Sequence, residues 1–104
     1  MFPVFVHEDA LEALDRLPER QQRKLQEWKG RLESDPLAGQ QVKHSLIPRI
    51  LQRRYAVTNL WRLALPGGWR ILYTLLVQEG DKGVLVLWIG THKEYDRLFG
   101  YHTS

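Results

Sequence analysis

The 104-residue chain contains no cysteine. It therefore forms no disulfide bond and offers no thiolate ligand to a metal ion. Its four histidines lack the paired spacing of a zinc site, so we expect neither a metal nor another cofactor. No stretch approaches the roughly 20 apolar residues that a membrane-spanning helix requires. The N-terminal segment has no basic region and soon meets acidic residues, which is atypical of a signal peptide. We expect a cytoplasmic protein that does not contact a membrane.

Acidic residues are absent between Pro36 and Gln78, although the whole chain has twelve of them. The bases of this acid-free segment are Lys43, Arg49, Arg53, Arg54, Arg62 and Arg70, and His44 adds a further positive charge when protonated. Such a concentration of positive charge attracts polyanions. The segment therefore predicts contact with nucleic acid, with an acidic protein partner, or with both. A solvated basic face is the structural alternative.

The N-terminal third predicts a strand followed by two helices. With 43% apolar residues the chain can bury one core, so we expect one domain over residues 1–104. Phe2 to Val6 is a short apolar run, and Pro3 restricts it to a sheet edge. A first helix begins at Asp9 in a capping-box-like pattern, and a second spans residues 19–33. The first turns of the second helix, residues 20–24, are expected to project into solvent. Residues 37–58 predict only an ordered basic connection.

The C-terminal half predicts a three-stranded antiparallel meander. Its strands are expected at Leu60–Leu65, Trp69–Val77 and Val84–Ile89, with turns at residues 66–68 and 79–83. The last two strands are apolar on both faces, so they should be inner strands, and the N-terminal strand should cover the last one. A short helix over residues 93–99 completes an α+β fold of strand, two-helix hairpin, meander and helix.

The first meander turn decides where two arginines point. A three-residue turn pairs Leu65 with Trp69 and Ala64 with Arg70, which places Arg62 and Arg70 on the same face. A two-residue turn would place them on opposite faces. The apolar residues match better across the three-residue turn. Two guanidinium groups on one face suit a phosphate group, because each makes bidentate contacts. Surface or ion-paired arginines are the structural alternative.

Further candidates for chemistry follow the last strand. Gly90 would allow a backbone or a ligand to approach closely. His92 could exchange protons near neutral pH, or could instead cap the final helix. Tyr95 could share the proton transfer, or could simply pack that helix. The four tryptophans are expected in the core, although an exposed one could stack an unpaired base.

The order of these elements resembles the RelE/ParE superfamily of type II toxin–antitoxin toxins. The resemblance is carried by the stretches LWRLALPGGWRILYTL and VLVLWIGTHKEYDRLFGY, together with DALEALDRLPERQQRKL in the helix hairpin. It implies a ribosome-dependent mRNA endonuclease, or mRNA interferase, that inhibits translation by metal-independent attack of the RNA 2′-hydroxyl. It also implies a cognate antitoxin protein, hetero-oligomer formation, and contact with mRNA and the ribosome.

Carried over by position, the resemblance places Arg70 at the reacting phosphate and Arg62 at a basic position of the preceding strand. His92 falls where the superfamily has Arg or His, and Tyr95 stands in for a tyrosine expected near Leu98. The RNA-binding candidates are Lys43, His44, Arg49, Arg53, Arg54 and Lys93. Ala64 and Leu98 replace a lysine and a tyrosine, which leaves open a ParE-like toxin that binds DNA gyrase, or an inactive relative.

Overall fold

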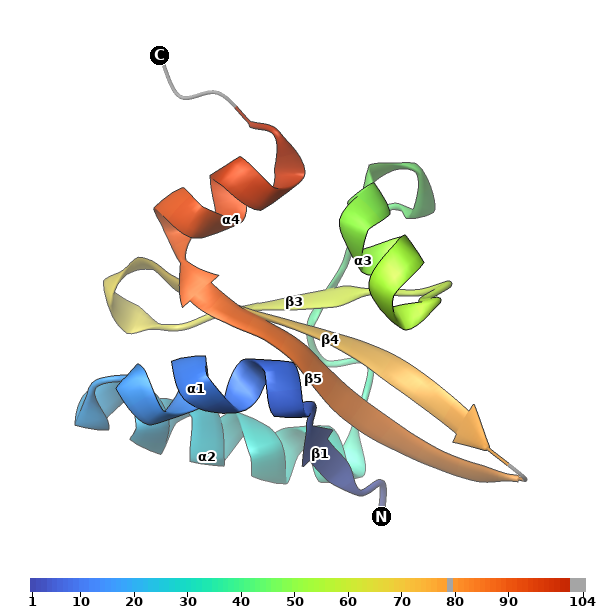
Figure 1. Ribbon diagram of the computed structural model, residues 1–104. Coiled ribbons are helices and arrows are strands. Elements are labelled where there is room, and N and C mark those ends of the chain that lie inside the picture. The colour runs from blue at the N-terminus through green and yellow to red at the C-terminus, as the bar shows by residue number, and fades with distance from the viewer. Residues whose placement is uncertain (79, 102–104) are drawn as a thin grey trace.

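A five-stranded sheet forms the centre of the protein, with the strand order β1-β5-β4-β3-β2 (Figure 1). The computed structural model describes residues 1–78 and 80–101. The strands are β1 (Val4–Val6), β2 (Gln40–Gln41), β3 (Trp61–Ala64), β4 (Trp69–Gln78) and β5 (Asp81–Thr91). β1 runs parallel to β5, and the other neighbouring strands are antiparallel. This arrangement confirms that β1 covers the outer side of β5 and that β4 and β5 are inner strands.

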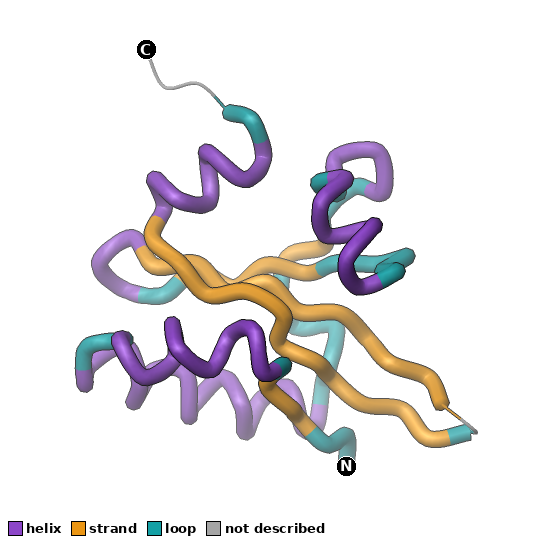
Figure 2. The backbone as a smooth tube through the Cα atoms, viewed as in Figure 1, coloured by secondary structure: helices purple, strands orange, loops and turns teal. Residues whose placement is uncertain are grey.

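Helices cover both faces of the sheet (Figures 1 and 2). They are α1 (Glu8–Arg16), α2 (Glu19–Ser34), α3 (Arg49–Tyr55) and α4 (His92–Phe99). The α1–α2 hairpin packs on one face over Leu63, Ile71 and Val86. The other face packs Leu72 and Leu87 against α3 and α4. None of the helices in the described ranges is long and apolar enough to cross a membrane.

The register of the first hairpin confirms the three-residue turn. Leu63 pairs with Ile71 and Ala64 pairs with Arg70, and the Leu65 N–H donates to the Trp69 carbonyl at 2.9 Å. The turn residues Pro66–Gly68 form a short 3-10 turn, η2. Both glycines of this turn have positive φ, which only glycine adopts freely. Arg62 and Arg70 therefore lie on the same face of the sheet, the face that α3 and α4 cover.

A β-bulge on β5 changes which side chains reach that face. Leu72 pairs with Trp88, whereas Tyr73 pairs with Val86, so Leu87 is the extra residue. Leu87 belongs to the cluster under α3 and α4, and Trp88 packs against the same cluster. Strict alternation would have placed these two neighbours on opposite faces.

Two expectations for the helix hairpin are wrong. The N-cap of α1 is His7, and not Asp9, because His7 Nδ1 accepts the Asp9 N–H at 3.0 Å. The first turns of α2 are not entirely solvated, because Gln21 is only 8% exposed. Its Nε2 donates to the Pro66 carbonyl at 2.9 Å and so ties α2 to the η2 turn.

The basic connection is more structured than the sequence predicted. It contains β2, the 3-10 turn η1 (His44–Leu46) and α3. Ile47 and Leu51 are buried beneath this segment, whereas Leu46 and Ile50 are exposed. The sheet therefore has one more strand than expected. The second meander turn is also shorter than expected, because β5 already begins at Asp81. Glu79, the first residue of the predicted turn, lies outside the described residues.

Candidate functional site

A pocket of about 190 Å³ lies on the same face of the sheet as Arg62, which is one of its lining residues. We call it the Arg62 cleft. The lining residues come from β2, the segment up to η1, β3, α4 and the chain after α4: Gln40, Gln41, Val42, Lys43, Leu46, Arg62, Tyr95 and Tyr101. Three of the predicted site residues, Lys43, Arg62 and Tyr95, are thus brought together although they are far apart in the sequence.

The Arg62 guanidinium is held from two sides. Its carbon lies 5.6 Å from the centre of the Tyr95 ring, which is a cation–π contact. One guanidinium nitrogen donates to Gln40 Oε1 from the adjacent strand β2. Gln40 pairs with Arg62 across the β2–β3 ladder, so backbone register sets this contact. Because a guanidinium has five N–H donors, Arg62 retains donors for a ligand in the cleft.

Tyr95 is buried rather than presented to solvent, with 5% of its surface exposed. Its ring stacks on Phe99 at 4.3 Å and lies 6.2 Å from the Trp88 ring. Burial raises the pKa of the Tyr95 hydroxyl, while the charges of Arg62 and Arg70 act in the opposite direction. The hydroxyl therefore remains protonated near neutral pH, and it is poorly suited to act as a general base.

Arg70 lies diagonally across the β3–β4 pair from Arg62, on the same face. One of its terminal N–H groups donates to the Trp69 carbonyl at 3.0 Å, and the side chain is half-buried. Arg70 pairs with Gly90 on β5. The sequence suggested that a ligand could approach Gly90 closely, and this is wrong. A Cβ at Gly90 would lie 2.5 Å from the Trp88 ring, so Trp88 already occupies that space. Trp88 thus closes the sheet surface beside Arg70.

His92 and Lys93 begin α4 and are both exposed. The sequence also suggested that His92 could cap the final helix. This is wrong, because Thr91 is the N-cap of α4 and forms a capping box with Glu94. These contacts lower the pKa of Glu94, chiefly through the Thr91 N–H. The His92 ring lies against Gly68, where an added Cβ would be 2.6 Å from Nδ1. His92 therefore borders the η2 turn and does not line the Arg62 cleft.

Four of the six predicted RNA-binding residues form a second group on η1 and α3. His44, Arg49 and Arg53 are exposed there. Arg54 differs from these residues in that it forms an ion pair within the protein: its Nε donates to Asp9 Oδ2 at 2.9 Å. The absence of acidic residues from this segment therefore does not leave Arg54 without a counter-charge, because Asp9 of α1, 45 residues earlier, supplies one.

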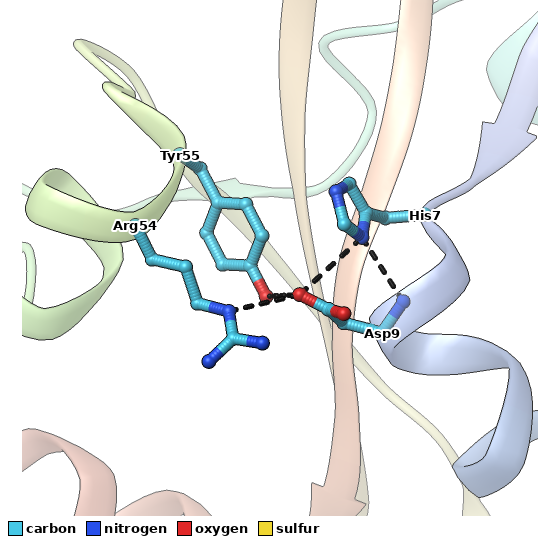
Figure 3. A network of polar contacts seen from close by, with 4 residues as sticks. All are labelled: His7, Asp9, Arg54 and Tyr55. Atoms are coloured by element: carbon cyan, nitrogen blue, oxygen red, sulfur yellow. Dashed lines mark hydrogen bonds and ion pairs between the residues drawn. The ribbon is translucent and has the colours of Figure 1, made fainter.

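Figure 3 shows how Asp9 joins three other side chains, those of His7, Arg54 and Tyr55. The Tyr55 hydroxyl donates to Asp9 Oδ2 at 2.7 Å, beside the Arg54 contact, and the Tyr55 ring meets His7 edge-on at 4.9 Å. The hydrogen bond from Tyr55 and the contact with Arg54 lower the pKa of Asp9. Burial, followed by the contact with Asp9, raises the pKa of Tyr55. This network anchors the C-terminal end of α3 to the start of α1.

Sequence reasoning missed Gln40 and Tyr101, which line the cleft. Neither residue is basic, and Gln40 also lies outside the stretches that carry the resemblance. A larger hollow of about 710 Å³ lies at the other end of the sheet, beside Met1, Phe5 and Gly83. It contains none of the predicted site residues, so we assign no chemistry to it. Within residues 1–78 and 80–101, no cluster of three histidine or carboxylate side chains is arranged to hold a metal ion.

Comparison with known proteins found no matching protein-family model and no matching curated protein. Solved structures do match, and they define the fold as that of the RelE toxins. The RelE–RelB complex of the archaeon Pyrococcus horikoshii matches with a TM-score of 0.60 and 21% identity, over 88% of this chain and 94% of that one. A double mutant of the E. coli toxin RelE in the free state matches with a TM-score of 0.60 and 15% identity, over 96% of this chain and 92% of that one.

Proposed function

We propose that the protein is the toxin of a type II toxin–antitoxin module and cleaves mRNA on the ribosome. The observation that carries the proposal is the convergence of Arg62, Arg70 and Lys43 on one face of a RelE-like sheet. Strands hold both arginines, and the face they occupy includes a cleft that is lined by Lys43 and by Leu46 of η1.

The chemistry we propose is attack of the RNA 2′-oxygen on the adjacent phosphorus atom. The bond from phosphorus to the 5′-oxygen breaks, which leaves a 2′,3′-cyclic phosphate and a 5′-hydroxyl. Negative charge builds up on the phosphoryl oxygens in the transition state, and Arg70 and Arg62 would stabilise it. His92 is the exposed candidate for proton transfer at the edge of this site. Lys43, His44, Arg49, Arg53 and Lys93 would hold the RNA backbone.

Translation reporters combined with mapping of mRNA ends test this proposal. Expression of the wild-type protein should lower reporter translation and produce new 5′-hydroxyl ends within translated reading frames. Arg70→Ala should abolish both effects while its circular dichroism spectrum and thermal midpoint remain close to wild type. Lys29→Ala, an exposed basic residue on α2 across the sheet, is the matched control and should keep full activity. Inhibition without new mRNA ends would contradict the nuclease assignment.

A second candidate is a ParE-like toxin or an inactive relative that acts by binding a protein such as DNA gyrase. The burial of Tyr95 favours this candidate, as does the half-buried apolar side chain of Leu98, because both reduce the number of proton-transfer groups at the site. Growth inhibition with intact mRNA and inhibited DNA supercoiling would establish it.

The antitoxin partner would neutralise the exposed bases. We propose that an acidic antitoxin segment covers Arg49, Arg53 and the sheet face of Arg62 and Arg70, forming a hetero-oligomer inside the cytoplasm. The Pyrococcus horikoshii RelE was crystallised as a RelE–RelB complex. Co-purification of a small acidic protein encoded by the adjacent gene would test this partnership directly.

A further inference from the structure

Gln21 is a buried amide on the side of α2 that otherwise packs the core. It lies four residues before Leu25 on the same side of the helix, and each of the two residues is 8% exposed. Burial of an amide costs free energy unless the amide forms hydrogen bonds. Here Nε2 donates to the Pro66 carbonyl at 2.9 Å, across 45 residues of sequence. Packing alone would favour an apolar residue at this position, so the distinctive property of Gln21 is its hydrogen bond to the η2 turn.

The η2 turn is in close contact with side chains from two helices. It lies at the edge of the sheet, with α2 on one side and α4 on the other (Figure 1). A Cβ added at Gly67 would lie 2.9 Å from Gln21 Nε2. A Cβ added at Gly68 would lie 2.6 Å from His92 Nδ1. Because the two glycines are adjacent in one short turn, a displacement of the turn on the α2 side would also move the surface on which the His92 ring lies.

Arg70 is held by the same turn. The η2 turn ends at Trp69, whose carbonyl accepts the Leu65 N–H at 2.9 Å. The same carbonyl accepts a terminal N–H of Arg70 at 3.0 Å. The atom that closes the turn is therefore also the acceptor that orients the Arg70 guanidinium. Arg70 and His92 thus both depend on the conformation of η2, although they come from β4 and α4.

We propose that Gln21 is a positioning residue for the site that contains Arg70 and His92. Its hydrogen bond to Pro66 fixes the η2 turn from the α2 side. The turn then fixes the Trp69 carbonyl and the place of the His92 ring. This inference rests on the proposed function, since that function assigns Arg70 and His92 to the reaction. The link from Gln21 to His92 is measurable without any activity.

The first experiment measures this link by NMR in the protein without RNA. In the wild type, a nuclear Overhauser contact should connect the Gln21 side-chain amide with Gly67, and a second should connect the His92 ring with Gly68. Gln21→Met keeps an unbranched side chain of similar length but has no N–H donor. The contact between His92 and Gly68 should therefore weaken, and the His92 ring resonances should shift. Absence of either contact in the wild type, or an unchanged His92 ring in Gln21→Met, would overturn the proposal.

A neighbouring glutamine provides a matched control. Gln22 is exposed on the same helix, and its Nε2 donates to the Leu17 carbonyl at 2.9 Å and to the Leu14 carbonyl at 3.4 Å. Gln22→Met thus removes side chain–backbone hydrogen bonding of the same kind, but within the α1–α2 hairpin and away from η2. It should leave the His92 ring resonances unchanged.

The second experiment measures cleavage of mRNA on programmed ribosomes. Gln21→Met should lower kcat by about tenfold or more, because a small displacement of groups that act in the transition state is costly. KM should change by less than about twofold, because the exposed bases that would hold the RNA backbone are untouched. Gln22→Met should keep both constants within about twofold of wild type. Equal losses of kcat in the two variants, or a rise in KM alone in Gln21→Met, would overturn the positioning role.

The outcomes separate this inference from the proposed function. Absence of cleavage by the wild type would contradict the proposed function and, with it, the catalytic consequence of Gln21, whereas the NMR spectra would still decide whether Gln21 holds His92. Cleavage that is equally fast in wild type and Gln21→Met would overturn the inference and leave the proposed function standing. If Gln21→Met does not fold, Gln21→Asn replaces it in both experiments, because its amide is one methylene too short to reach Pro66.

Discussion

Replacing Tyr73 by phenylalanine should destabilise the protein through a single oxygen atom. The Tyr73 hydroxyl donates to the Pro36 carbonyl at 2.8 Å and accepts the Gly39 N–H at 3.0 Å. Tyr73 itself is fully buried on β4, and its ring stacks on Trp61 at 6.0 Å. Phenylalanine retains the ring and its packing. The substitution therefore removes only the link between β4 and the segment that leads into β2.

The magnitude follows from the two hydrogen bonds. Each contributes about 1 kcal/mol to stability, and a partner left unsatisfied in a buried place adds to the loss. We therefore expect Tyr73→Phe to lower the free energy of unfolding by roughly 2 kcal/mol. For a domain of about 100 residues, a loss of that size lowers the thermal midpoint by roughly 8 to 16 °C. The dependence on urea concentration should keep its slope, because the buried surface is unchanged.

Urea unfolding and amide hydrogen exchange together test this reasoning. The Gly39 amide should exchange faster in Tyr73→Phe, even under conditions where the global fold is intact. Gly39→Ala should produce a similar local effect, because its Cβ would lie 2.6 Å from the Tyr73 hydroxyl oxygen. A loss of stability below about 0.5 kcal/mol, the level of an ordinary surface substitution, with unchanged Gly39 protection would refute the proposed link.

Four further predictions concern charge. RNA cleavage by the purified protein on programmed ribosomes should continue in EDTA when ribosome integrity is maintained with polyamines, and strict dependence on a divalent ion would contradict the mechanism. Antitoxin association should slow as salt rises past about 0.15 M, where the Debye length is roughly 8 Å. Arg53→Glu should lower its on-rate in stopped-flow measurements, and unchanged kinetics would remove α3 from the interface. Asp9 has a lowered pKa in the folded state, so its contribution to stability is present above its unfolded pKa of about 3.9 and disappears as pH falls through the folded value. Asp9→Asn should therefore reduce the loss of stability on acidification below about pH 4, as measured by thermal unfolding at several pH values.

The sheet core was predictable because its pattern is local. Alternation in β3, together with two glycines in the connecting turn, favours the register that matches its apolar residues to those of β4 on the hairpin face. The same register places Arg62 and Arg70 on the other face. The parallel strand β1 was also predictable, because β5 is apolar on both sides and needed a neighbour.

The contacts that build the site depend on long-range pairing, and this explains why they were missed. β2 is only two residues long, and neither Gln40 nor Gln41 has a propensity that marks a strand. The Arg54–Asp9 pair joins residues 45 positions apart, which no count of charge along a segment can detect. The bulge at Leu87 reverses the alternation within a continuous apolar run, and the sequence of that run gives no sign of it.

The position that Tyr95 occupies in the structure differs from the one that a proton-transfer role would require. The sequence left two interpretations of Tyr95 open: it could share proton transfer, as a stand-in for the tyrosine that the resemblance places near Leu98, or it could pack the final helix. Residues three apart lie on one side of a helix, and here both side chains belong to or pack against the cluster beneath α4. Since that side of the helix faces the sheet, a tyrosine at position 95 must bury its ring. The burial places the ring under the Arg62 guanidinium and keeps the hydroxyl protonated. The structure therefore shows Tyr95 in a cation–π contact with Arg62, and under the proposed function the exposed candidate for proton transfer is His92 in the first turn of α4.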